Sequence, residues 1–213
     1  MGTTKLILFN KALVEYLNER AISSLSEDTE SRRLLDKVYD GGLINFVLEQ
    51  GLWNHAMRKQ SLTYDPDTTV EFGYTYAFNI PTDHIRPAAI SADEMFSVPL
   101  LQYETMRDLW FANHDTIYVK YVSNDSLYGA DLSLWPPSFI EYVASYLALQ
   151  ICGKLTGSKV DKEELKKEVK TRLSTAKSKD AIAEPTQIPP VGAWAGGRGG
   201  GNRERGSRGR LIG

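Results

Sequence analysis

The sequence has a single cysteine, Cys152, among 213 residues, and this excludes a disulfide bond within the chain. Cys152 lies near the apolar face of a stretch with helical spacing, where cysteine usually acts as a small buried side chain. A reactive thiol would need a basic group beside it to lower its pKa, and the adjacent Ile151 and Gly153 supply none. We therefore expect Cys152 to be a core residue.

Long apolar runs and metal-ligand spacings are also missing. No stretch reaches the roughly 18 apolar residues that a membrane span needs. The apolar run within residues 1–10 is too short for a signal peptide. His55, His84 and His114 are far apart and share no zinc-ligand spacing with Cys152. We expect no membrane contact, no metal site and no other cofactor.

Charge is unevenly distributed along the chain. The formal net charge is −2, but five arginines and one glutamate from Gly196 onward give the tail +4, so the remainder carries −6. An acidic body with a basic tail suggests that the tail has a partner of its own.

Composition leaves several interpretations of the tail open. Gly196–Gly201 resemble an RGG nucleic-acid element but lack the Lys-Ser/Thr ending of a phosphate-binding loop. A disordered linker and an arm that becomes ordered on a partner are the alternatives. Trp194 and the Leu211-Ile212 pair favour the arm, because apolar side chains are unfavourable in a solvated linker. Residues 183–213 are predicted to form an extended arm rich in Pro, Gly and Arg.

The stretch from Trp135 to Ser158 predicts a helix over residues 137–155. Pro136-Pro137 suits a first helical turn, because proline has a fixed φ and no N–H. Gly157 can adopt the positive φ that follows a helix end. One broad face is apolar at helical spacing. Its residues are Phe139, Ile140, Val143, Leu147, Ile151 and Leu155.

Three further helices are predicted, over residues of about 4–19, 27–50 and 161–179. Ser24 and Glu27 form a capping-box pattern before the second of them. Gly41-Gly42 in its middle permit either a bend or close contact with a neighbour. The last helix has a narrow apolar stripe and should pack through a thin seam, with Asp161 as its cap.

A small antiparallel β region is predicted over residues of about 60–122. Val70–Ile80 alternate between apolar and polar residues, which predicts one long half-buried strand. Asp65-Pro66-Asp67 predict a turn before it. Val98–Glu104 and Thr116–Val122 predict two more strands. We expect the aromatic residues of the long strand to pack against helices; base stacking is the alternative.

Charged pairs give no clear active site. Asp93-Glu94 and Glu27-Asp28 are adjacent in sequence, whereas glycoside hydrolysis needs two carboxyl groups about 5–9 Å apart across a cleft. Asp83 and Arg86, which follow Pro81, predict a turn-stabilising pair, with an interface role as the alternative.

Several segments, taken in order, resemble one family, the tail tubular protein A or head-to-tail adaptor family of short-tailed bacteriophages. No single segment is specific, but the ordered series covers residues of about 5–182. The segments are Phe9–Leu13, Ile22–Ser31, Trp53–Ala56, Gly73–Arg86 and Leu134–Ser158.

The resemblance implies a mainly helical α+β fold, roughly a four-helix bundle with a small β insertion, over residues 1–182. It implies a structural protein that is not an enzyme. Copies would form a ring, expected to be twelvefold, between the portal protein and the tail nozzle, or tail tubular protein B. The ring would extend the DNA channel at the portal–tail junction of the virion, without sequence-specific DNA binding.

The resemblance also implies contacts for individual residues. The arm would dock on the portal, and other residues would contact neighbouring subunits or the nozzle. The arm residues are Trp194, Arg198, Arg203, Arg205, Arg208, Arg210, Leu211 and Ile212; the others are Asp83, Arg86, Tyr128 and Trp135.

Two other function classes remain open from the sequence. A nucleic-acid-binding protein would act through the Arg/Gly tail, and its binding would weaken steeply with salt. A virion-associated cell-wall hydrolase would depend on a carboxylate whose removal abolishes lysis.

Overall fold

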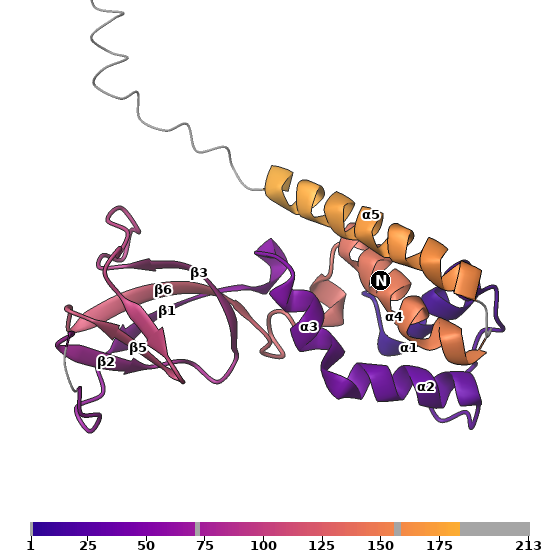
Figure 1. Ribbon diagram of the computed structural model, residues 1–213, viewed down its shortest axis with the longest axis horizontal. Helices are drawn as coiled ribbons and strands as arrows, with labels where there is room; N and C mark the ends of the chain where they lie inside the picture. Colours follow the sequence, from indigo (N-terminus) through magenta and orange to yellow (C-terminus); the bar gives the residue numbers. More distant parts are fainter. Residues whose placement is uncertain (1, 71–72, 156–158, 184–213) are drawn as a thin grey trace, which may run out of the picture. The chain divides into compact units, whose positions relative to one another are not determined.

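The computed structural model describes residues 2–70, 73–155 and 159–183 (Figure 1). Helices come first and last along this part of the chain, and the strands lie between them in sequence. The helical segments are α1 (Lys5–Lys11), η1 (Ala12–Tyr16), α2 (Glu30–Val38), η2 (Tyr39–Leu43), α3 (Ile44–Glu49), η3 (Asn54–Ala56), η4 (Leu132–Leu134), α4 (Pro137–Leu155) and α5 (Lys159–Ala183). The strands are β1 (Met57–Thr63), β2 (Tyr76–Asn79), β3 (His84–Ser91), β4 (Glu104–Met106), β5 (Leu109–Ala112) and β6 (Thr116–Ser123).

The first predicted helix is confirmed, with a change of geometry along its length. Thr4 caps α1 by accepting a hydrogen bond from the backbone N–H of Ile7, and the chain continues as the π-helical segment η1. Asn10 ties the following loop to this helix. Its side chain both accepts from the N–H of Ile22, at 2.8 Å, and donates to the carbonyl of Ile22, at 2.9 Å.

The second predicted helix is kinked. Segments α2, η2 and α3 follow one another, and Gly42 has a φ of 97° where they bend. A Cβ atom added at Gly41 or Gly42 would meet nothing within 4 Å, so the glycine pair serves the bend and not a close contact. The predicted capping box is wrong: Thr29 is the N-cap, and Glu27 instead accepts from the N–H and hydroxyl of Ser23.

Helix α4 begins and ends where the sequence predicts. The carbonyl of Pro136 accepts from the N–H groups of Phe139 and Ile140, which closes the first turn. α4 packs along α5 (Figure 1). α5 is longer than predicted and begins at Lys159, so Asp161 lies inside the helix and is not its cap. Its thin apolar seam is confirmed, because only Leu165 and Ala176 of its described side chains are buried.

The helical part has a core of its own, formed by α1–α5 and the turns that join them. Trp53, Trp135 and Phe139 meet at its centre: the Trp53 and Phe139 rings lie 4.7 Å apart and the Trp135 and Phe139 rings 4.9 Å apart. Trp53 also donates its indole N–H to the carbonyl of Val47 at 3.1 Å. These contacts join the end of α3, the start of α4 and the turn before β1.

The strands form two antiparallel three-stranded sheets with the orders β1-β6-β3 and β2-β5-β4. Strand β6 pairs on both sides, so that Lys120 lies opposite Lys59 of β1 and Ala89 of β3. Pro87 lies in β3, an edge strand, where its missing N–H is tolerated. A second core lies between the sheets. Its buried residues are Phe78, Ile90, Leu100, Trp110, Ala112, Ile117, Val119 and Tyr121.

The strand boundaries differ from those predicted. The long strand over Val70–Ile80 is reduced to β2, since Gly73 has a φ of 92° and the backbone N–H of Thr75 bonds the Asn113 side chain. Val98–Glu104 is mostly not a strand, whereas β6 confirms Thr116–Val122. The Asp65 turn is confirmed by its bonds to Asp67 and Thr68.

The fold class predicted from the resemblance is wrong in its proportions. Of the described residues, 46% are helical and 20% lie in strands, which is a mixed α+β fold and not a mainly helical four-helix bundle with a small insertion. The physical reason is that the strands bury Trp110, Phe78 and Tyr121 in a separate core instead of lending one face to the helices.

Candidate functional site

A partly buried polar cluster around Asp83 holds the turn before β3. The Asp83 carboxylate accepts from the Arg58 guanidinium at 2.8 Å, from the Tyr121 hydroxyl at 3.2 Å and from the hydroxyl of Ser123. The Asp83 side chain is only 15% exposed. The cluster therefore ties the β3 turn to β1 and β6. The predicted Asp83–Arg86 pair is wrong, since the exposed Arg86 donates to the carbonyl of Glu49 at 3.2 Å instead.

The protonation states in this cluster follow from its donors. Burial raises the pKa of Asp83, but the hydrogen bonds from Ser123 and Arg58 outweigh burial and hold the pKa below its usual value. Burial and the charge on Asp83 raise the pKa of Tyr121. Asp83 is therefore a carboxylate and Tyr121 a neutral donor near pH 7, which suits a structural ion pair.

The loop after β6 continues this cluster toward α4. The Arg58 guanidinium lies 5.4 Å from the centre of the half-buried Tyr128 ring. Gly129 is buried, and a Cβ there would come within 2.2 Å of the Ser123 carbonyl oxygen. The Trp135 indole, 4% exposed, donates to the Gly129 carbonyl at 2.9 Å. Of the four predicted contact residues that the structure describes, Trp135 thus lies in the core of its own chain, and only Arg86 is well exposed.

The predicted arm residues lie outside the described part of the chain. They are Trp194, Arg198, Arg203, Arg205, Arg208, Arg210, Leu211 and Ile212.

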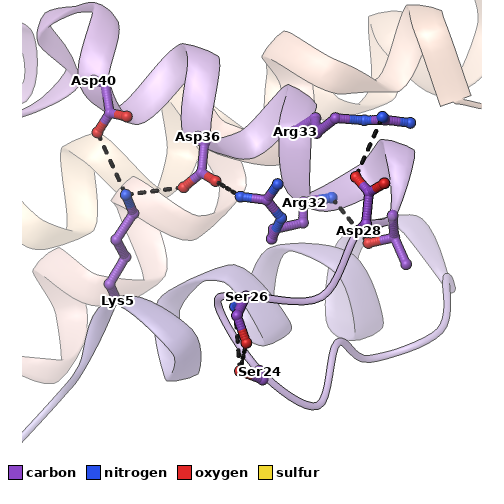
Figure 2. A network of polar contacts seen from close by, with 9 residues as sticks. Lys5, Ser24, Ser26, Asp28, Arg32, Arg33, Asp36 and Asp40 are labelled. Carbon is purple, nitrogen blue, oxygen red and sulfur yellow. Dashed lines mark hydrogen bonds and ion pairs between the residues drawn. The ribbon is translucent and has the colours of Figure 1, made fainter.

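The N-terminal helix is braced by a network of ions (Figure 2). Lys5 reaches between Asp36, at 2.9 Å, and Asp40, at 3.3 Å, while Arg32 pairs with Asp36 from one turn earlier on α2. The Lys5 ammonium also lies 4.3 Å from the centre of the Tyr39 ring. These contacts join α1 to α2 and η2, on the N-terminal side of the bend at Gly42. The arrangement is that of a structural brace.

The histidines lie in different surroundings. His55 packs 4.8 Å from the Phe139 ring, and burial lowers its pKa to about 4. Burial also lowers the pKa of His84, which lies 5.1 Å from the Trp110 ring, although Asp83 opposes the shift. His114 is exposed. Among the described residues, no group of three or more His, Cys, Asp or Glu side chains could hold a metal ion.

The β part has an apolar surface that the sequence did not predict. Between β3 and β5 the chain exposes large apolar side chains, with Met95 at 84% and Leu101 at 86% exposure. We call residues 93–103 the apolar segment. The run of apolar residues around Pro99 was visible in the sequence, but Val98–Glu104 was assigned to a strand, so its exposure was not expected. The exposed apolar residues of this region are Met95, Val98, Leu101, Tyr103 and Met106.

The start of the apolar segment is held rigidly. The Asp93 carboxylate accepts from the Ser91 hydroxyl at 2.6 Å and from the backbone N–H groups of Ser97 and Val98, at 3.0 and 2.8 Å. These bonds, led by the one from Ser91, hold the pKa of Asp93 well below its usual value. Phe96 completes the turn with a φ of 56°. Met95 is thus presented to solvent on a fixed turn.

A cleft of about 380 Å³ lies beside strands β4 and β5. We call it the β4–β5 cleft. Its volume is within the range of about 300–1,000 Å³ that is typical of binding pockets. Most of its lining is apolar, with one cation and one acid among the side chains. The lining residues are Thr69, Val70, Tyr74, Glu104, Met106, Arg107, Leu109 and Phe111.

None of the helices in the described residues has the length and apolar character of a membrane span. Comparison of the chain with protein-family models and with curated proteins found no match.

Proposed function

We propose that this protein is a structural adaptor of a short-tailed bacteriophage, placed between the portal ring and the tail nozzle. Copies form a ring, expected to be twelvefold, that extends the DNA channel. The protein makes and breaks no bond; it acts by its shape, its charge and its contacts.

One observation carries the proposal: the segments that resemble the adaptor family belong to one folded unit and are joined by specific contacts. Asn10 and Ile22 exchange two hydrogen bonds between the first and second segments. Trp53 of the third packs on Phe139 of the last, at 4.7 Å. These contacts favour treating the segments as parts of one unit over a chance likeness of separate short motifs.

Further contacts link the β part to the helices. The Arg86 guanidinium bonds the carbonyl of Glu49, and the side chains of Asn124 and Asn45 bond each other at 2.8 Å. Asn54 bonds Asp180 of α5 through both its backbone and its side chain. A structural adaptor has to hold its parts together, and contacts of this kind do so.

Charge supports the same function. The body carries −6 and the tail +4, so a DNA duplex passing an acidic wall would be repelled and slide freely. The arginines of the arm would bind carboxylates of the portal, because a guanidinium forms paired hydrogen bonds with a carboxylate. The same arginines keep nucleic-acid binding as the second candidate.

Among the carboxyl groups of the described residues whose pKa is clearly shifted, none has the raised pKa of a hydrolase acid. A glycosidase acid must stay protonated and therefore needs a raised pKa. Here burial opposes the shift at Asp83 and Glu141, but hydrogen-bond donors hold the pKa below its usual value at a whole series of carboxyl groups. They are Glu27, Asp65, Asp83, Asp93, Asp131, Glu141 and Glu163.

The test is the native mass of the protein with and without its portal protein, for the full chain and for a chain ending at Pro190. A ring-sized increase with portal would support the adaptor, and its loss on truncation would assign docking to the arm. No increase, together with salt-sensitive DNA binding by the tail, would overturn the adaptor and favour the second candidate.

A matched pair of variants separates the arm's charge from its length. Changing the five tail arginines to glutamine should weaken portal docking, whereas Glu204→Gln alters the same segment without removing a cation. Equal binding by both variants would assign docking to apolar groups such as Trp194 or to the folded body.

A further inference from the structure

The apolar segment and the β4–β5 cleft are separate surfaces of one chain. The exposed side chains of the segment, Met95, Val98 and Leu101, are not among the residues that line the cleft. No residue of the apolar segment lines the cleft, although Tyr103, at the end of the segment, precedes Glu104 of the cleft. A contact between two different surfaces of identical chains repeats from copy to copy and can close into a ring.

From this we infer that the apolar segment of one copy docks into the β4–β5 cleft of the next copy. The inference deepens the proposed ring and rests on it, because it names the surfaces through which neighbouring copies meet. The occupant of the cleft is then a second copy of this chain.

The chemistry of the two surfaces matches. Val70, Leu109 and Phe111 give the cleft aliphatic and aromatic walls. Met95 is a long, adaptable side chain, and methionine sulfur packs favourably against aromatic rings. Burial of Met95 and Leu101 would remove the most exposed of the large apolar side chains in the described β part from water.

Charge matches as well. Glu94 is exposed beside Met95, and the exposed Arg107 lines the cleft. Asp93 is held by its own turn and does not compete for that arginine. The segment carries no cation, so Glu104 at the cleft gains no partner, and the contact has one complementary pair.

The turn also reduces the cost of docking. Binding normally orders flexible side chains and loops, and this ordering opposes association. The bonds from Ser91, Ser97 and Val98 to Asp93 fix the turn before any partner arrives. A rigid apolar projection beside a matching cleft is the arrangement expected of an assembly contact.

Cysteine cross-linking tests the contact directly. Chains carrying Met95→Cys are mixed at high concentration with chains carrying Met106→Cys, a residue of the cleft, under a mild oxidant. We expect a disulfide-linked pair in the mixture. A double variant should give a ladder of linked copies. Leu127→Cys, which is exposed on a different loop, replaces Met95→Cys in the control and should give no link.

Charge reversal gives a second measurement that does not depend on cysteine. Arg107→Glu should weaken self-association at least tenfold, and adding Glu94→Arg to the same chain should restore it. Circular dichroism of both variants checks that the fold is retained. Weakening without restoration would overturn the Glu94–Arg107 pairing.

The outcomes separate this contact from the adaptor function. Portal-bound rings without the 95–106 link would overturn the contact and keep the adaptor. A disulfide link without portal binding would support the contact and overturn the adaptor function. If neither the link nor portal binding is observed, both hypotheses are overturned. A link between two copies of Met95→Cys, or docking of the nozzle protein in the cleft, would also overturn the inferred contact.

Discussion

The helical part and the β part use their apolar residues differently. The helical part buries Trp53, Phe139 and Trp135 at its centre and holds much of its surface with ion pairs, such as Glu168–Arg172 on α5 and the Lys5 brace. The β part has a smaller core and leaves a run of large apolar side chains in water, from Met95 to Met106. On the proposed function, the first part would supply stability and the second a binding surface.

The largest expected effect is on the helical core. Phe139→Ala should lower the free energy of unfolding by about 3–5 kcal/mol, because a fully buried ring that contacts two tryptophans is lost. Met95→Ala, at an exposed position, should change it by no more than about 0.5 kcal/mol. Urea unfolding of both variants measures the difference. A similar loss of unfolding free energy in both variants would contradict the view that the helical core supplies most of the stability.

Acid should weaken the helical core through His55. Burial lowers the pKa of His55 to about 4, and unfolding returns it to its ordinary value near 6.5. Between these values the unfolded chain binds a proton that the folded chain does not, so stability falls as the pH falls from about 6.5 to 4. The expected loss is about 2–3 kcal/mol. His84, whose pKa is lowered by burial in the β part, should add to the loss.

Thermal or urea unfolding at several pH values between 7 and 4.5 checks this dependence. His55→Phe should flatten it, since the imidazole makes no hydrogen bond within the described residues. His114→Gln, at an exposed position, is the control. If the slope survives in His55→Phe, its source lies elsewhere, with His84 as the first candidate.

The polar cluster should dominate the stability of the β part. Asp83→Asn removes the charge that faces Arg58 and should lower the free energy of unfolding by about 1–3 kcal/mol. Asp125→Asn, whose carboxylate lies 3.9 Å from the same arginine and is 35% exposed, should cost less, about 0–1 kcal/mol.

Hydrogen exchange shows where the stability is lost. Faster exchange in β6 with unchanged exchange in α4 would mean that the two parts open separately. Equally faster exchange in β6 and α4 would mean that the helical part and the β part unfold as one unit. The two parts would then differ only in their exposed apolar surface and not in stability.

Local patterns in the sequence were sufficient for α4, β6, the first helix and the Asp65 turn, but not for most strand boundaries or for the pairing of the sheets. Pro136-Pro137 and regular apolar spacing define α4 without reference to any partner. β3 was missed because Pro87 breaks the strand pattern, which an edge strand tolerates. The salt bridge between Asp83 and Arg58 joins residues 25 positions apart, which a local pattern cannot indicate. The nearby Arg86 was therefore predicted as the partner of Asp83 instead.

The sheets show the limit of local patterns most clearly. Alternation over Val70–Ile80 gives the correct type of structure at Tyr76–Asn79, but the length of a strand depends on its partner. β5 offers only Leu109–Ala112 for pairing, and Gly73 turns the chain away. A separate β core could not be foreseen, because the pairing of β1 with β6 brings together segments more than fifty residues apart.

The smallest expected effect tests the bend between α2 and α3. Gly42→Ala places a side chain at a φ of 97°, which should cost about 1–2 kcal/mol. Gly41→Ala is the matched control: its φ is not positive and its Cβ would meet nothing within 4 Å, so it should stabilise by about 0.5–1 kcal/mol. Opposite signs in urea unfolding would show that the bend needs glycine at one position only. A cost at both would mean that the pair is strained as a whole. Lys5 of α1 contacts Asp36 and Asp40 just before the bend. The same variants therefore also measure how strongly the packing of α1 depends on the geometry of the bend.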